Sequence, residues 1–224
     1  MLKLVLAFTL CTPFSAFAAD QDRLNVGEEA PSFRLKSMNP DTSKIAAFAL
    51  DDYVGTDADD PTKQKKAVVL SFFASYCEPC KRELPFLSAL YKEYASQGLM
   101  VASVSIDKDE EAIKKVQDLI NTVKPEHVVT NDHFQVVGKR YYVKTLPALY
   151  IVGADKNIAV AKVGYGEGAT QEIFAAVRKS LGIDEKQPVP ASLSRFLTAA
   201  APAKNAEPVQ VPAASKKKGR KKSA

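Results

Sequence analysis

Apolar residues form two different patterns in the first half of the chain, first a short run and then a helical period. Residues 66–73, KAVVLSFF, form a short run rich in apolar, β-branched and aromatic side chains, which predicts a buried strand. Over residues 78–97 the apolar side chains recur every three or four positions, as on one face of an amphipathic helix, and Gly98 provides a stop. We therefore expect a strand that turns directly into a helix.

The same order is then repeated. Residues 99–106 predict a second strand, and Asp107 with Glu110 has the Asp-x-x-Glu spacing of a helix start. Two strands that are joined through a helix are expected to run parallel in one sheet. The pattern therefore predicts an α/β fold.

The second half of the chain adds an antiparallel edge to this sheet. The apolar runs 148–152 and 158–163 flank a polar turn, which predicts a hairpin, and residues 170–181 predict a final amphipathic helix. Residues 132–142 are also predicted to be helical, whereas the run 128–130 is too short to assign. The expected architecture is a mixed β-sheet flanked by helices.

The N-terminal end has the composition of a signal peptide. Residues 1–18 contain one cation, a short apolar run and then Ala16-Phe17-Ala18, which is the small-x-small pattern of a cleavage site. The apolar run is too short to span a bilayer, so an uncleaved anchor is the second interpretation. Lipid attachment at Cys11 is the third, because the bulky Leu10 precedes it.

The C-terminal segment 185–224 is rich in Pro, Ala and Lys without an apolar period, so it is predicted to be a disordered tail. Seven cations and one anion lie beyond residue 203, so of the net charge of +5 the first 203 residues carry −1. The folded domain, expected over residues 19–184, therefore offers no electrostatic case for nucleic-acid binding. The basic cluster 216–222 is a candidate for contact with anionic surfaces, although such runs are more often only solvated.

Cys77 and Cys80 carry the candidate chemistry, and Glu78 and Pro79 complete their motif. Cleavage of the signal peptide would leave these two cysteines alone, so no structural disulfide framework is expected. Helix positions i and i+3 face the same way, so the pair can close a disulfide across one turn. Free N–H groups at the helix start stabilise a thiolate, which makes Cys77 the expected accessible nucleophile and Cys80 the resolving thiol.

Two other interpretations of the cysteine pair are open. Zinc could use both cysteines with His127 and His133, but the spacing fits a zinc finger poorly. A merely structural disulfide would stabilise little, because it closes a loop of one turn. The two histidines are expected to face solvent or to form local hydrogen bonds, and no role is assigned to them.

Three segments carry a family resemblance. Residues 72–85, FFASYCEPCKRELP, resemble the active-site segment of the thioredoxin superfamily, and most closely its exported TlpA/ResA-like branch, which is related to AhpC/TSA proteins and linked to cytochrome c maturation. Thr145-Leu146-Pro147 resembles the cis-proline loop of that family, and residues 27–33 resemble its N-terminal hairpin entry. The resemblance covers about residues 26–182 and implies a thioredoxin-like fold with an N-terminal hairpin extension.

The resemblance also implies a substrate-binding edge. A cis Pro147 packed against the disulfide would hold Thr145 and Leu146 as a short β-edge, to which an extended substrate segment can pair. The alternative is an ordinary trans proline at the start of a strand.

One departure from the family pattern concerns the proton-transfer group. Thioredoxins carry a buried Asp where this chain has Ser71, so the resemblance to ResA-like proteins implies that Glu83 assists proton transfer at the dithiol instead. The alternative for Glu83 is a solvated helix carboxylate. The usual tryptophans are replaced by Phe73 and Tyr76.

The function implied by the resemblance is reduction of specific protein disulfides outside the cytoplasm, in the periplasm or a similar compartment. Apocytochrome c is an implied substrate, a membrane thiol carrier is the implied electron donor, and no cofactor or metal is expected. Two alternatives stay open. A peroxiredoxin-like thiol peroxidase would need a Thr where Ala74 stands, and a non-catalytic periplasmic binding module would not need the cysteines.

Overall fold

The centre of the fold is a mixed five-stranded sheet. The computed structural model describes residues 23–55, 60–166, 168–198 and 209–212. The strands of the sheet are β3 (Ala67–Phe73), β4 (Leu99–Ser105), β5 (Val128–Asn131), β7 (Ala148–Gly153) and β8 (Ile158–Val163). They lie in the order β5-β4-β3-β7-β8, in which β3, β4 and β5 are parallel and β7 is antiparallel to both β3 and β8. The predicted parallel core with an antiparallel edge is confirmed.

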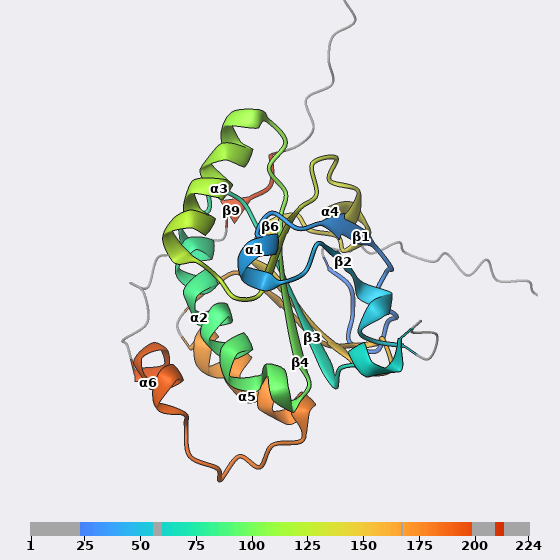
Figure 1. Cartoon of the computed structure of the whole chain (residues 1–224), viewed down its shortest axis with the longest axis vertical. Coiled ribbons are helices and arrows are strands. Elements are labelled where there is room, and N and C mark those ends of the chain that lie inside the picture. Colours follow the sequence, from blue (N-terminus) through green and yellow to red (C-terminus); the bar gives the residue numbers. More distant parts are fainter. Residues whose placement is uncertain (1–22, 56–59, 167, 199–208, 213–224) are drawn as a thin grey trace, which may run out of the picture.

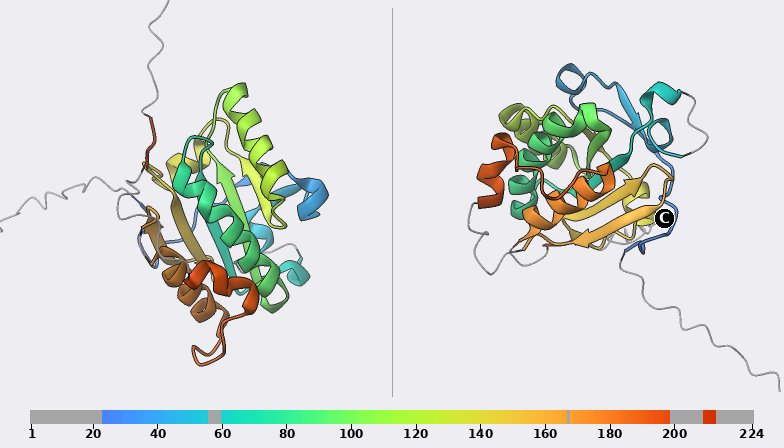
Figure 2. Two further views of the ribbon diagram at one scale, coloured as in Figure 1. Left: turned by 90° about the vertical axis from the view of Figure 1, so that its left-hand side faces the viewer. Right: turned by 90° about the horizontal axis from the view of Figure 1, so that it is seen from below.

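Side chains alternate along the strands between two hydrophobic clusters. On β3, Val69 belongs to the cluster that includes side chains of α2 (Glu78–Tyr94) and α5 (Ala169–Leu181), whereas Leu70 belongs to the cluster that includes side chains of α3 (Glu110–Val123). Neighbouring strand residues face opposite sides of a sheet, so the apolar residues of one strand supply both clusters. Helices therefore cover both faces of the sheet (Figures 1 and 2).

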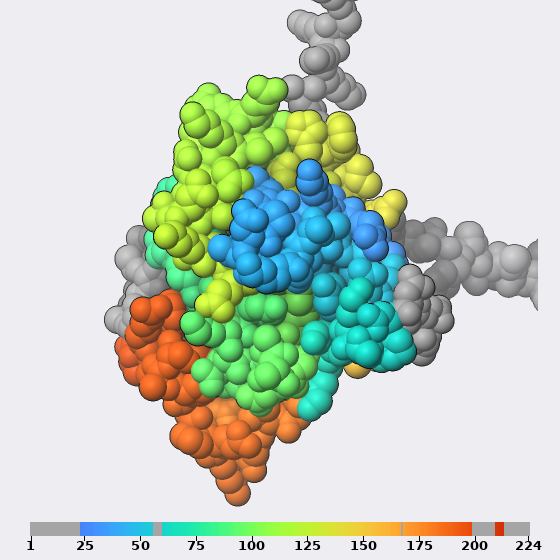
Figure 3. All heavy atoms as spheres, in the orientation of Figure 1, coloured from blue at the N-terminus to red at the C-terminus, as the bar shows by residue number. Residues whose placement is uncertain are grey.

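An N-terminal β-hairpin lies on the same side of the sheet as α3. β1 (Arg34–Lys36) pairs antiparallel with β2 (Ala47–Ala49), and α1 (Pro40–Ser43) lies between them in the chain. Phe48 of β2 is fully buried, and its ring stacks 5.3 Å from the ring of Tyr53. The hairpin lies beside α3 on the face shown in Figure 3. Three short 3-10 helices complete the framework: η1 (Leu50–Asp52), η2 (Pro61–Lys63) and η3 (Ala95–Gln97).

The start of α3 differs from the prediction. The helix begins at Glu110, because the carboxylate of Asp109 accepts the N–H of Ala112 at 2.8 Å and caps it. An Asp in extended conformation before the first helical residue is a preferred N-cap. Asp107, which we predicted to start the helix, is therefore not its N-cap residue.

The helix predicted over residues 132–142 is shorter than expected. Only α4 (Val136–Arg140) is helical. The Asp132 carboxylate accepts the N–H groups of Val136 and Gly138 at 3.0 and 2.8 Å, and Gln135 has a left-handed φ of 53°. The backbone therefore turns before residue 136 and cannot continue as helix through these positions.

The prediction of a disordered tail over 185–224 is wrong for two segments. α6 (Ala191–Thr198) packs against α2 and α5, with Leu193 fully buried and the Phe196 ring 5.7 Å from the ring of Phe86. β9 (Val209–Gln210) pairs with β6 (Thr145–Leu146). The overall Ala and Pro content conceals a short amphipathic face in α6, which gains its stability by packing.

The remaining predictions about the termini concern residues outside the described part of the chain. These are the signal peptide over residues 1–18 and the basic cluster 216–222. Among the described residues, no helix has the length and apolar character that a membrane crossing would require.

Candidate active site

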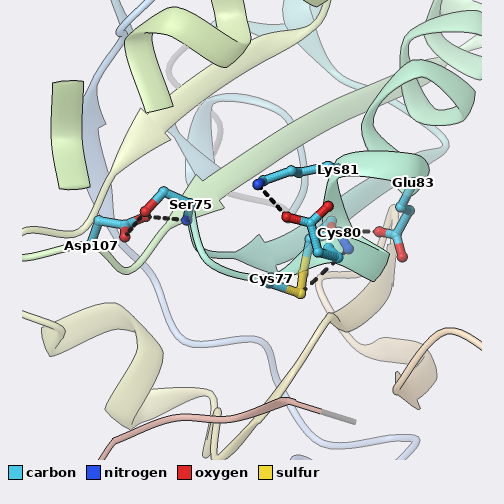
Figure 4. Close-up of a disulfide and its surroundings, with 8 residues drawn as sticks. Ser75, Cys77, Cys80, Lys81, Glu83 and Asp107 are labelled. Atoms are coloured by element: carbon cyan, nitrogen blue, oxygen red, sulfur yellow. Dashed lines mark hydrogen bonds and ion pairs between the residues drawn. A yellow bond between two sulfur atoms is a disulfide. The ribbon is translucent and has the colours of Figure 1, made fainter. Parts of the chain in front are cut away.

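A disulfide joins Cys77 and Cys80 at the start of α2 (Figure 4). Their Cα atoms lie 5.3 Å apart. Cys77 is the N-cap residue of the helix, and its Sγ accepts the N–H of Cys80 at 3.3 Å. Pro79 in the first turn has no N–H that would need a partner. The helix start thus directs a backbone donor and the positive end of its dipole toward the Cys77 sulfur, as a thiolate requires.

The loop that leads into the disulfide is held by Asp107. Its carboxylate accepts the N–H and the Oγ–H of Ser75 at 2.8 Å each (Figure 4). It also accepts the Oγ–H of Ser105 at 2.8 Å. All three side chains are buried. Asp107 follows β4 and Ser75 follows the parallel neighbour β3, so both lie at the same end of the sheet. This contact was missed in the sequence, although the parallel pairing of the two strands was a signal for it.

Glu83 lies one helical turn beyond Cys80 and is buried. Only 2% of its surface is exposed, and its Oε1 accepts the Oγ–H of Ser71 at 2.6 Å. Burial raises the pKa of Glu83 to about 7, although the Ser71 hydrogen bond and the charge of Lys162 act in the opposite direction. The interpretation of Glu83 as a solvated carboxylate is therefore wrong. At neutral pH this carboxyl can both take and give a proton.

The charge of Glu83 also acts on a second group. Burial raises the pKa of Tyr165 to about 12, and the Glu83 carboxylate adds to this effect. Tyr165 is 6% exposed, so the phenol stays protonated and neutral beside the carboxyl group.

The peptide bond between Leu146 and Pro147 is cis, as the resemblance implied. The carbonyl of Pro147 accepts the N–H of Gly164 at 2.7 Å, which ties the loop to the end of β8. Leu146 is fully buried, and Thr145 is half-buried. The backbone edge of Thr145 and Leu146 is paired with β9.

Access to the cysteines differs from the expectation. Cys77 has no exposed surface and Cys80 is 3% exposed, so exposure does not distinguish the two in the disulfide form. The neighbouring Tyr76 is 45% exposed. The assignment of Cys77 as the nucleophile therefore rests on its place at the helix start.

The histidines lie apart from this chemistry. His127 is fully buried, which contradicts a solvent-facing position, and its Nε2 lies 2.9 Å from the Ser103 hydroxyl. Burial lowers the pKa of His127 to about 3. The His133 ring contacts the Phe134 ring at 4.8 Å. Within the described ranges, no three His, Cys, Asp or Glu side chains are grouped as a metal site would need.

Comparison with known proteins agrees with this fold. Residues 26–161 match the model of the AhpC/TSA family. The thiol-disulfide oxidoreductase ResA of Bacillus thuringiensis (strain Al Hakam) is 25% identical over 168 residues, which are 75% of this chain and 86% of the relative. ResA of Oceanobacillus iheyensis is 28% identical over 158 residues, 70% of this chain and 75% of the relative.

Solved structures give the same result for the fold. A candidate thiol:disulfide interchange protein DsbE from Chlorobium tepidum superposes with a TM-score of 0.60 at 22% identity, over 71% of this chain and 99% of the other. A thiol:disulfide interchange protein from a Bacteroides species gives 0.53 at 22% identity, over 73% and 94%. These likenesses show a thioredoxin-like fold. Because the family model covers more than half of the sequence, this chain belongs to the AhpC/TSA family.

Proposed function

We propose that Cys77 and Cys80 are the redox-active pair of an exported thiol–disulfide oxidoreductase that reduces specific protein disulfides. The observation that carries this proposal is a closed Cys77–Cys80 disulfide at a helix start, with the buried carboxyl group of Glu83 one turn beyond it. A disulfide that served only stability would not need a titratable group in the adjacent turn.

The reaction begins from the reduced dithiol. The Cys77 thiolate attacks one sulfur of the substrate disulfide, so a Cys77–substrate bond forms, the substrate S–S bond breaks, and the second substrate sulfur leaves as a thiolate. Cys80 then attacks Cys77, which releases the first substrate sulfur and closes the Cys77–Cys80 disulfide. The protein loses two electrons and the substrate gains them. The substrate thiols take up two protons, which balance the proton that Cys77 releases to solvent when it ionises and the proton of the Cys80 thiol.

Glu83 is assigned to the proton transfers in this sequence. With a pKa of about 7 it can accept the proton of the Cys80 thiol as that sulfur becomes nucleophilic, and then return it to the leaving thiolate. An ionised Glu83 near the dithiol would also disfavour a thiolate pair, which lowers the reduction potential and favours the reducing direction.

Substrate recognition is assigned to Thr145, Leu146 and Pro147. An extended segment that carries the substrate disulfide would pair with this backbone edge by strand addition. The substrate class includes apocytochrome c, by likeness to the ResA-like branch. A reductant in an oxidising compartment needs electrons from the cytoplasm, so a membrane thiol carrier is the proposed donor.

A peroxidase function has less support. Peroxiredoxins place a Thr three residues before the reactive cysteine, and Ala74 here has no hydroxyl to offer a peroxide. A binding module without catalysis does not account for the buried Glu83 beside the cysteine pair.

The test is a trap for the mixed disulfide. The Cys80→Ser variant should accumulate a covalent complex with its substrate through Cys77, which mass spectrometry identifies, whereas the matched Cys77→Ser variant should accumulate none. Equal yields from the two variants would contradict the assignment of the nucleophile. Equilibration with glutathione tests the direction: a potential near about −270 mV supports a reductant, and one near about −120 mV contradicts it.

A further inference from the structure

The proposed substrate edge is occupied by the chain itself. β9 pairs antiparallel with β6, with Gln210 opposite Thr145 and Val209 opposite Leu146 (Figure 1). The next residue continues the ladder, because the N–H of Val211 donates to the carbonyl of Lys144 at 2.8 Å. Residues 209–211 thus hold backbone positions that a strand-forming substrate would need.

The side chains of this segment alternate as in a bound strand. Val209 and Val211 are half-buried and pack against the hydrophobic cluster that contains Cys77, Cys80 and Leu146, whereas Gln210 is exposed. Prolines at positions 208 and 212 flank the segment, and neither can donate to a ladder. The pairing is therefore confined to a short stretch, and a short ladder can be displaced.

Burial of the disulfide is consistent with this occupancy. Cys77 and Leu146 have no exposed surface in the state where β9 is paired. A protein substrate must bring its own sulfur to Cys77 and its own backbone to the edge at Leu146. The self-segment and the substrate therefore exclude each other at the edge.

We propose that residues 209–211 are an intramolecular pseudosubstrate, which competes with extended protein segments for the edge of residues 144–146. This inference rests on the proposed function for the identity of the competing ligand. The segment also indicates what the edge accepts: an extended strand with β-branched apolar side chains at alternate positions and a polar one between them. The apparent affinity for a partner is reduced to the fraction of the protein molecules in which the edge of residues 144–146 is free.

The test measures access to a single thiol and needs no catalysis. All proteins carry Cys80→Ser in the chain without residues 1–18, so Cys77 is the only cysteine. A truncation ending at Pro208, and the double variant Val209→Ser with Val211→Ser, are compared with the matched control Gln210→Ser. The rate of Cys77 alkylation by a maleimide should rise about three- to tenfold in the first two, as expected if the segment is docked about 70–90% of the time. The control should be unchanged.

A peptide of residues 206–214, added to the truncated protein, should slow alkylation again, and a peptide with Ser at both valine positions should not. Equal alkylation rates in the parent and in both released variants, or no effect of the peptide, would overturn the inference. The double variant retains full length and covers the case of a truncation that fails to fold.

Reduction of the substrate protein recovered by the Cys80→Ser trap is a separate arm, measured in proteins that keep both Cys77 and Cys80. Recovery of no mixed disulfide at Cys77 would contradict the proposed function, whereas the alkylation result would still decide the docking. With the recovered substrate, release of the segment should lower KM and leave kcat unchanged.

Discussion

Ser71 and Glu83 face each other across β3 and α2, with the Ser71 hydroxyl donating a 2.6 Å hydrogen bond to the Glu83 carboxylate. Ser71 stands where the resemblance places a buried Asp, and in this chain the carboxyl group is carried by the helix, three residues after Cys80. Ser71 and Glu83 are both buried, so the hydrogen bond between them is shielded from solvent.

Glu83→Gln should slow disulfide exchange about a hundredfold at neutral pH, because proton transfer to and from Cys80 would lose its carboxyl group. The pH dependence of the rate near pH 7 should disappear, which stopped-flow measurements would detect. Glu111→Gln, at an exposed position of α3 whose ion pair is with Lys115, serves as control. An unchanged pH profile would show that Glu83 has only a structural role.

The same variant has a predicted effect on stability. The folded pKa of Glu83 is about 7, above its usual 4.5, so the folded state binds more protons between these values. The contribution of Glu83 to the free energy of unfolding is therefore full below pH 4.5. It falls as pH rises toward 7, by up to about 3 kcal/mol. Urea unfolding of Glu83→Gln should lack this loss. Because His127 is present in both proteins, the comparison is made between the wild type and Glu83→Gln at each pH. A stability difference between them that is the same at pH 5 and pH 8 would contradict the prediction.

The contribution of His127 to stability has the opposite pH dependence. Its folded pKa of about 3 lies below its usual 6.5, so the unfolded state binds more protons in between. Stability should be full above pH 6.5 and should fall as pH decreases toward 3, by up to about 5 kcal/mol. His127→Gln keeps a polar group beside Ser103 and should remove this acid sensitivity. Urea titrations at pH 4 and pH 7 would show it, with His133→Gln as control.

Asp107→Asn should loosen the loop before Cys77. The amide has one acceptor oxygen where the carboxylate has two, so the bonds from Ser75 and Ser105 cannot all be kept, at a cost of about 1–3 kcal/mol. Faster amide exchange at Ser75 and a slower disulfide exchange are expected. Asp109→Asn is the matched control, because Asn caps a helix as well as Asp does.

Leu193→Ala should destabilise the domain by about 2–4 kcal/mol, because it leaves a cavity between α6 and its neighbours. Urea unfolding measures the loss. Thr198→Ala, at the exposed end of α6, should change stability little. An unchanged midpoint for Leu193→Ala would restore the interpretation of this segment as a tail without a structural role.

The local pattern of the sequence was sufficient for the elements that hold the disulfide. The apolar run of β3, the helical period after Cys77 and the Gly98 stop depend on neighbours in the chain, and each was predicted within about three residues of its observed bounds. The i, i+3 spacing of Cys77 and Cys80 likewise determined that they could bond. These features are local, so composition and period describe them.

Tertiary structure alone decided which groups meet at the site. Ser71 and Glu83, Ser75 and Asp107, and Leu146 and Val209 are separated by 12, 32 and 63 positions in the sequence, and no period along the chain relates them. The tail was misjudged for the same reason: α6 and β9 are too short to be stable alone, and only a preformed helix face and a preformed sheet edge stabilise them. The titration of Glu83 also follows from burial, which depends on everything packed around it and not on its place in the sequence.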